Sequence, residues 1–417
     1  MSKKMHYSWS VVIGCAIIMF STMAGIGNTI GVFFTTINAE RGFSMAQLGL
    51  YYTFQGITVT LTLPLVRKLF YKIDARAMAF IAVTLMSLGY ALFAFWPAVW
   101  GWWVSGVIIG CGIGFVGFGM IPLLMNSWFK KKFTAAVGIA YAANGLGGFV
   151  FTLSIGRLIG AMGYQTTYIV IAVATFLISM PGVFLLRSKP ADKDLFPYGI
   201  SSAEELELAN KKDDPLKMPG LMFKDALKRP VFWLMVVALL IMLFGCNLQT
   251  QMTNLAYSIG FSVANATVVS ALVMLGNIPG RILIGALIDK FNAKVGYTYA
   301  GLCGVLSIVC FLLSGVSGAF VYIGAFLFGN FFPITAFGPS VLLPTVVGRK
   351  DYGTIQSYVA TLSTIVGIFA STIFGAVYDA SGTYATILYV FVIGLAVATL
   401  GVWLIWKICK KEEWNRK

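Results

Sequence analysis

Charged residues are scarce in this chain of 417 residues: only 11% are Asp, Glu, Lys or Arg, whereas 59% are hydrophobic. The mean hydropathy of +0.85 excludes an ordinary soluble domain. The apolar runs are longer than core helices need and long enough to cross a bilayer. Because no water satisfies backbone groups in a bilayer core, such a chain must form helices or a closed barrel. The runs are continuous and not alternating, so the sequence predicts an all-α integral membrane protein.

Residues that commonly carry catalysis or bind metals are also rare. The single histidine, His6, precedes the first apolar run, so none is available within the membrane. The six cysteines lie within or at the ends of the apolar runs without metal-ligand spacing, and we interpret them as packing residues. No acidic residue is found in the middle of a run. We therefore expect no enzyme activity, no cofactor and no metal site.

The charges that remain are distributed unevenly. Lys and Arg number 30 against 15 acids, which gives a net charge of +15. With the spans given below, 27 of the 30 cations fall in alternate loops and the two tails. Since cationic loops stay in the cytoplasm, this bias predicts a multi-pass protein of the plasma (inner) membrane with both termini cytoplasmic. A nucleic-acid surface would not skip every second loop, so we expect no nucleic-acid partner.

The hydropathy pattern predicts twelve membrane spans. We place them at 9–36, 46–66, 77–97, 101–127, 135–160, 165–186, 230–258, 263–284, 296–315, 319–345, 354–378 and 384–407. One long polar segment, 187–229, separates the first six from the last six. We interpret it as a solvated cytoplasmic linker between an N-terminal six-helix bundle, 1–186, and a C-terminal six-helix bundle with its tail, 230–417.

The two halves repeat each other at an offset near 219 residues. Asn28 corresponds to Asn247 and Gly110 to Gly329, and further matches extend over most of each half. Chance gives a few glycine matches in a glycine-rich chain, but matches at one offset over this length indicate an internal repeat.

Two arginines fall within predicted spans: Arg157, near the outer end of 135–160, where we interpret it as a structural arginine that snorkels to the surface, and Arg281 in 263–284. Arg281 lies eight residues before Asp289, which along a helix is about 12 Å inside the point where charges resume. A bilayer core is about 30 Å thick, so this arginine is expected near its middle. A cation there costs at least about 2.5–3.5 kcal/mol and normally faces a wet cavity or a partner. Asn277, one turn earlier on the same face, is placed to orient the arginine or a ligand.

The stretch GALIDKFNAK at 285–294 resembles the loop signature of major facilitator transporters, and the two six-helix repeats resemble their architecture. Arg281, Gly285 and Asp289 also reproduce a spacing of the oxalate:formate antiporter and monocarboxylate transporter branch. The resemblance implies that Arg281 binds the substrate carboxylate, for which a planar guanidinium is well suited. The alternative is an arginine that snorkels to the surface.

The same resemblance implies a gate at the loop. Asp289 and Lys290 are expected to latch the inward gate. The corresponding loop of the first half, 67–76, matches the signature poorly, and its last residue, Arg76, is expected to take part in the gate. A purely structural loop is the alternative.

Two departures from that branch narrow the expected substrate. Asn277 stands where eukaryotic monocarboxylate carriers place an aspartate that takes part in proton coupling. The stretch Tyr358-Val359-Ala360 lacks the helix 11 lysine of oxalate carriers. One buried cation without a buried acid favours a monoanion over a dianion.

The remaining site candidates are amides and aromatic residues within spans. Amides left unpaired in lipid are costly, so they should face either the central cavity or another helix, and both readings stay open. The aromatic residues either narrow the cavity or only pack. The predicted substrate contacts are Arg281, Asn277, Asn28, Asn247, Gln251, Phe118, Phe337 and Tyr358.

We predict a secondary active transporter, expected to be monomeric in the lipid bilayer, that moves a small organic monoanion by alternating access. It acts as an antiporter or a proton-coupled symporter. The first alternative is a major facilitator exporter of drugs or neutral metabolites, which a poor transport response to anions would favour. The second is a receptor or scaffold that does not transport, which would lack two access states.

Overall fold

The computed structural model describes residues 6–70, 72–200, 202, 219–348, 350–410 and 412, with the side chains of 67, 118, 134 and 336–341 outside the description. The described chain is helical, with two isolated bridges and no strand among these residues. It divides into two compact units, Met1–Lys212 and Asp213–Lys417.

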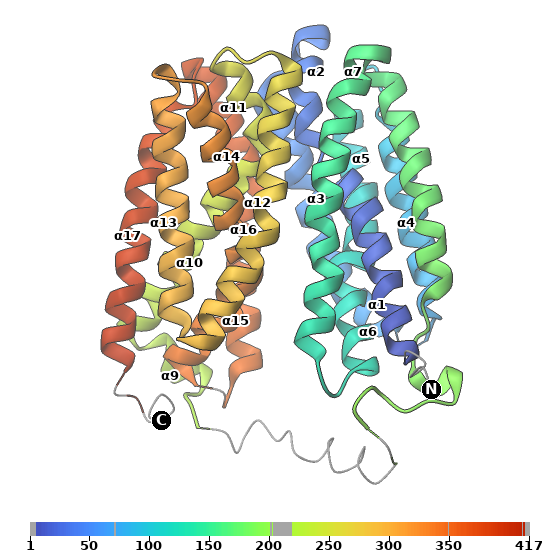
Figure 1. Ribbon diagram of the computed structural model, residues 1–417, viewed down its shortest axis with the longest axis vertical. Helices are drawn as coiled ribbons and strands as arrows, with labels where there is room; N and C mark the ends of the chain where they lie inside the picture. The colour runs from blue at the N-terminus through green and yellow to red at the C-terminus, as the bar shows by residue number, and fades with distance from the viewer. Residues whose placement is uncertain are drawn as a thin grey trace. The chain divides into compact units, whose positions relative to one another are not determined.

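The N-terminal unit is built from helices of which several are interrupted (Figure 1). Its α-helices are α1 Tyr7–Ile18, α2 Phe34–Arg41, α3 Met45–Phe70, α4 Ala75–Leu92, α5 Trp100–Ile113, α6 Ile121–Trp128 and α7 Phe133–Leu185. Two π-helical stretches, Met19–Gly27 and Gly114–Met120, and two 3-10 turns, Ile30–Phe33 and Pro190–Lys193, complete it.

Helix α7 is two membrane rods joined at one glycine. As a single helix its apolar stretch Ala135–Leu185, of 51 residues, would be about 77 Å long, more than twice the thickness of a bilayer core. Gly163 breaks it with φ 76° and ψ 166°, a backbone conformation that residues with a Cβ rarely adopt. Figure 1 accordingly shows α7 as two adjacent rods joined by a turn. The break falls between the predicted spans 135–160 and 165–186.

The C-terminal unit contains the second set of helices. Its α-helices are α9 Phe223–Leu227, α10 Pro230–Cys246, α11 Met252–Ser258, α12 Val263–Lys290, α13 Ala293–Leu312, α14 Ala319–Phe331, α15 Ile334–Val347, α16 Tyr352–Ser381 and α17 Ala385–Cys409. Two 3-10 turns, Asn247–Gln251 and Leu313–Gly315, interrupt or extend them.

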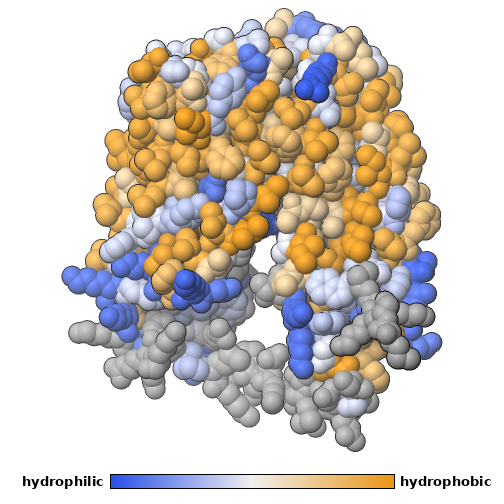
Figure 2. Space-filling view, in the orientation of Figure 1, coloured by the Kyte–Doolittle hydropathy of each residue, from blue (hydrophilic) through white to orange (hydrophobic). Residues whose placement is uncertain are grey.

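The spans predicted from hydropathy are present in both units. Nine of the described helical stretches are long and apolar enough to cross a membrane, counting Ala135–Leu185 once. With α7 divided at Gly163, and with α3 and the broken α14–α15 rod included, each unit has six rods. Apolar side chains cover most of the visible length of the rods, and hydrophilic ones gather toward the ends (Figure 2). The prediction of an all-α membrane protein with twelve spans is confirmed, although helix ends shift by several residues: the span 77–97 ends at Leu92.

One helix contact occurs in both units at equivalent positions. Gly110 of α5 packs so closely on α3 that a Cβ there would lie 2.6 Å from the carbonyl oxygen of Gln55. Gly329 of α14 packs on α12 in the same way, with its Cβ position 2.3 Å from the carbonyl oxygen of Val273. Gly110 and Gly329 are the glycines paired by the sequence repeat. The two bundles are therefore pseudo-symmetric in packing as well as in sequence.

Candidate functional site

Arg281 lies within the membrane part of α12. It precedes the end of this helix at Lys290 by nine residues, which is about 14 Å along the axis. The arginine is half-buried, whereas its neighbours Ile282 and Leu283 are 66% and 44% exposed. The apolar side chains of this turn therefore take the exposed face, and the cation is the less accessible group.

Asn277 supplies a buried acceptor one turn before Arg281. The side chain is 6% exposed, and within the described part of the chain its Oδ1 atom is buried without a hydrogen-bond partner. Pro279 lies between the two residues and has no N–H to donate to the carbonyl of Leu275. A buried acceptor without a partner costs about 1–3 kcal/mol and calls for an explanation, such as a water or ligand that completes the site.

Helices α13 and α14 add two polar residues next to this part of α12. Gly280 packs so tightly that a Cβ would lie 2.6 Å from the Cα of Asn330 on α14. Tyr299 of α13 donates a hydrogen bond from its hydroxyl to Asn330 Oδ1 at 3.0 Å, and Asn330 Nδ2 donates to the carbonyl of Phe326 at 3.0 Å. We call Asn277, Arg281, Tyr299 and Asn330 the α12 polar cluster.

Sequence reasoning missed two members of this cluster, Tyr299 and Asn330. Spacing along a single helix does not reveal them, because these two side chains meet across α13 and α14. An amide in the middle of an apolar run was the signal available for Asn330, because such amides need a partner.

Two pairs of helices lose regular α geometry at equivalent positions of the repeat. Asn28 follows the π-helical stretch Met19–Gly27, and its counterpart Asn247 opens the 3-10 turn Asn247–Gln251. In the same way Gly114 opens a π-helical stretch, and its counterpart Pro333 separates α14 from α15. At membrane depth such irregular backbone is tolerated where it is buried in protein or lines a cavity, and π-helical insertions often mark functional sites. The first pair lies on the helices that carry Asn28 and Asn247, and the second pair lies on the α5–α6 and α14–α15 rods.

In the N-terminal unit, Asn28 is half-buried and bound to another amide. Its Nδ2 donates to Asn144 Oδ1 of α7 at 2.5 Å. The adjacent Thr29 is buried, donates to the carbonyl of Gly25 at 2.6 Å and contacts the hydroxyl of Tyr90 at 3.1 Å. Asn144, which is also half-buried, is a further polar residue that the sequence reasoning did not name.

The two predicted amides of helix 7 have different surroundings. Asn247 is half-buried, donates to the carbonyl of Leu243 at 2.8 Å and faces Gly367 of α16. Gln251 is fully buried and donates to Ser371 Oγ at 2.9 Å. Its Oε1 accepts from Asn254 at 2.6 Å and from the Tyr384 hydroxyl at 3.1 Å. These bonds favour the interhelical reading for Gln251 and leave Asn247 the better candidate for contact with a solute.

The predicted aromatic contacts are described only in part. The side chains of Phe118 and Phe337 lie outside the described residues. Tyr358 of α16 is half-buried, and its ring meets that of Phe223 edge-on, with centroids 5.3 Å apart. Phe223 N–H in turn donates to Asp351 Oδ2 at 2.9 Å, so Tyr358 lies beside the start of α9 in the C-terminal unit.

The predicted gate residues lie at helix ends. Asp289 and Lys290 are exposed on the last turn of α12, and Lys290 Nζ lies 5.5 Å from the centroid of the Phe291 ring. No ion pair of Asp289 occurs among the described residues. Arg76 is held locally by Asp74, which caps α4 and accepts from the Arg76 guanidinium at 3.0 Å. The latch therefore stays a prediction.

Comparison with known proteins identifies the fold family. A model of the Major Facilitator Superfamily matches residues 15–371. The chain belongs to this superfamily. It is 22% identical to "Probable transporter MCH2" of Saccharomyces cerevisiae, over 92% of this chain and 79% of that protein. It is 21% identical to "Monocarboxylate transporter 12" of Xenopus laevis, over 91% of this chain and 84% of that one.

A solved structure supports the same fold. The xylose transporter XylE from E. coli, in a partially occluded inward-open conformation, aligns with a TM-score of 0.71 and 14% identity, over 96% of this chain and 99% of that one. This major facilitator protein is thus a multi-pass membrane transporter of small molecules and not an enzyme, as the sequence predicted.

Proposed function

We propose that this major facilitator protein carries a small organic monoanion, a monocarboxylate, across the plasma membrane by alternating access. Arg281 binds the carboxylate, and Asn277 orients the arginine or the ligand. The transport mode is exchange for another anion or symport with a proton.

The observation that carries the proposal is the pairing of a half-buried arginine with an unsatisfied amide in mid-helix. A guanidinium stays charged in an apolar site and offers a planar fork that fits a carboxylate. Asn277 can turn its amide so that either the oxygen meets the guanidinium or the NH₂ meets the ligand. Tyr299 and Asn330 lie on the neighbouring helices and limit the space around α12.

The charge of the α12 polar cluster favours a substrate with one carboxylate. It contains one cation and no acid, so a second carboxylate would enter without a partner. Relatives named monocarboxylate transporters, at 21% identity, support the same substrate class. The coupling mode is open because Asn277 cannot take up a proton as the aspartate of related carriers does.

A carrier of neutral metabolites or drugs is the second candidate. The half-buried amides Asn28, Asn144 and Asn247 offer neutral donors and acceptors that would suit a hydroxylated solute. In that case Arg281 would be a structural cation, and anions would neither bind nor be exchanged.

Reconstitution of the purified protein into proteoliposomes distinguishes these functions. Labelled formate, acetate, lactate and pyruvate are tested for uptake, for exchange against unlabelled anion, and with or without a proton gradient. The proposal expects saturable transport of at least one of them that Arg281→Gln abolishes. Arg157→Gln is the matched control, because Arg157 is the other arginine predicted within a span and is exposed. Equal transport by both variants would show that Arg281 does not bind the carboxylate, and the absence of saturable transport of all four anions would favour the second candidate.

A further inference from the structure

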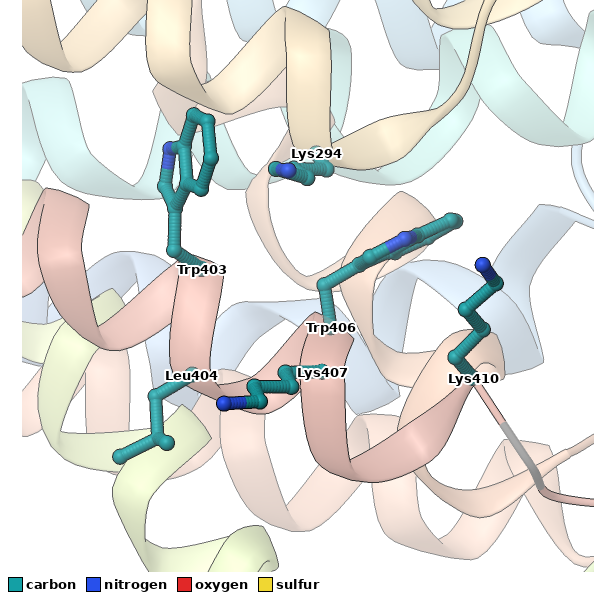
Figure 3. A pocket seen from close by; sticks show the side chains of 6 residues that line it. All are labelled: Lys294, Trp403, Leu404, Trp406, Lys407 and Lys410. Carbon is teal, nitrogen blue, oxygen red and sulfur yellow. The ribbon is translucent and has the colours of Figure 1, made fainter.

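A pocket outside the α12 polar cluster lies at the membrane-surface end of α13 and α17 and is shown in Figure 3. Its volume is about 490 Å³. Six described residues line it: Lys294, Trp403, Leu404, Trp406, Lys407 and Lys410. Three of the six are cations and none is an acid, so the lysine–tryptophan pocket is suited to an anion.

The pocket is built by specific contacts on its α13 side. Lys294 is half-buried, and its Nζ lies 3.3 Å from the centroid of the Trp403 ring, a cation–π contact. The Trp403 indole N–H donates to Thr298 Oγ1 at 2.9 Å, and Thr298 Oγ1 donates to the carbonyl of Lys294 at 2.8 Å. These bonds hold the indole ring beside the ammonium group and fix one wall.

The α17 side carries two pairs of residues spaced by one helical turn. Trp403 with Lys407, and Trp406 with Lys410, are each four residues apart at the end of α17. Figure 3 shows Lys407 and Lys410 extending to either side of Trp406. Both lysines are exposed. The acid nearest in sequence among the described residues, Glu412, forms an ion pair with Arg229, which leaves the lysines of the pocket uncompensated by that acid.

An exposed apolar face on α17 leads away from the pocket toward the membrane interior. Val390, Ile393, Val397 and Leu400 recur at helical spacing and are 57–69% exposed. On α13, Leu302 and Leu306 are 53% and 52% exposed. Side chains exposed in this way on a membrane helix face lipid, while tryptophan and lysine at a helix end are typical of the headgroup region.

We propose that the lysine–tryptophan pocket binds the phosphate headgroup of an anionic phospholipid, whose acyl chains lie along the exposed apolar face of α13 and α17. The three lysines supply the charge complementarity, and the two indole rings fill the headgroup region beside them. A basic pocket between membrane helices is suited to this class of lipid. A free phosphate ion would use the same lysines but would gain nothing from the apolar face.

Quenching of tryptophan fluorescence by brominated lipids tests this proposal. The full-length protein is placed in phosphatidylcholine nanodiscs containing increasing amounts of brominated phosphatidylglycerol or brominated phosphatidylcholine. The quenching of the two pocket tryptophans is obtained as the difference in quenched fluorescence between the wild type and the Trp403→Phe/Trp406→Phe variant. We expect half-maximal quenching at roughly 30-fold lower mole fraction of the anionic lipid, as two lysines near the surface would provide.

Three variants and one competitor decide the outcome. Lys407→Gln/Lys410→Gln should lose the preference for the anionic lipid, and Lys407→Arg/Lys410→Arg should keep it. Lys68→Gln/Lys72→Gln removes two exposed lysines, one in the last turn of α3 and one just after it, and should leave the preference intact. Equal quenching by both lipids, or a preference that survives Lys407→Gln/Lys410→Gln, would overturn the proposal. Displacement of the brominated lipid by millimolar inorganic phosphate would assign the pocket to a free anion and would equally overturn it.

Discussion

Asn277 and Arg281 lie one turn apart on α12, and the buried Oδ1 of Asn277 has no hydrogen-bond partner within the described structure. A buried acceptor without a hydrogen bond lowers the stability of the folded protein, and a role of Asn277 in substrate binding would explain why this residue is present. The relationship leads directly to predictions for both residues.

Replacing Asn277 should separate stability from function. Asn277→Leu removes the unsatisfied acceptor and keeps a side chain of similar branched shape, so the melting temperature should rise by about 2–4 °C. Transport of the monocarboxylate should fall, because the amide no longer orients Arg281 or the ligand. Thermal unfolding and uptake are measured on the same preparation. A lower melting temperature with unchanged transport would show that Asn277 has a packing role instead.

The close helix contact of the C-terminal unit predicts a large effect of one methyl group. Gly329→Ala places a Cβ 2.3 Å from the carbonyl oxygen of Val273, so α12 and α14 must move apart, at a cost of about 1–3 kcal/mol. Gly160→Ala is the matched control, because nothing lies within 4 Å of its Cβ position. The melting temperature should fall for the first variant and stay level or rise for the second. Equal melting temperatures would contradict the packing described.

Much of this architecture could be predicted from the sequence, because the bilayer imposes simple rules on length and polarity. Hydropathy located twelve spans, and the break of α7 at Gly163 lies in the gap left between two of them. The sequence repeat pairs Gly110 with Gly329, and both glycines make the same kind of close helix contact, Gly110 with α3 and Gly329 with α12. These features depend on local composition or on the repeat, so they can be recognised without coordinates.

The candidate site was less accessible to sequence reasoning. A stripe at helical spacing grouped Gln251 with Asn247, yet the structure shows that Gln251 bonds to Asn254 on its own helix and to Ser371 and Tyr384 on other helices. Asn144 was missed for the same reason. The π-helical stretches also escaped prediction, since their position depends on packing against other helices and not on local propensity.

The cation distribution predicts the orientation in the membrane. With 27 of 30 Lys and Arg in alternate loops and tails, both termini and the segment 187–229 should be cytoplasmic. A cysteine introduced by Ser201→Cys should react with an impermeant maleimide only after permeabilisation, whereas Ser317→Cys should react in intact cells. The wild type with its six cysteines provides the blank. Labelling of Ser201→Cys in intact cells would reverse the orientation.

The single cation of the α12 polar cluster predicts selectivity by substrate charge. Monocarboxylates should inhibit transport better than dicarboxylates of similar size, because burying a second unpaired carboxylate costs roughly several kcal/mol before relaxation. Formate, acetate and lactate are compared with oxalate and malonate as competitors of the best labelled substrate. Stronger inhibition by the dicarboxylates would mean that a second cation takes part in binding.

The role of Arg281 is the central claim, and substrate-induced thermal stabilisation of purified variants tests it most directly. The probe is whichever of formate, acetate, lactate or pyruvate stabilises the wild type most. Arg281→Lys should retain a small part of the shift, because it keeps the charge and loses the fork. Arg281→Gln should lose the shift, with the melting temperature of the empty protein unchanged or raised, while Arg157→Gln keeps the shift. If Arg281→Gln is stabilised by the same anion at the same concentration as the wild type, Arg281 does not bind the carboxylate.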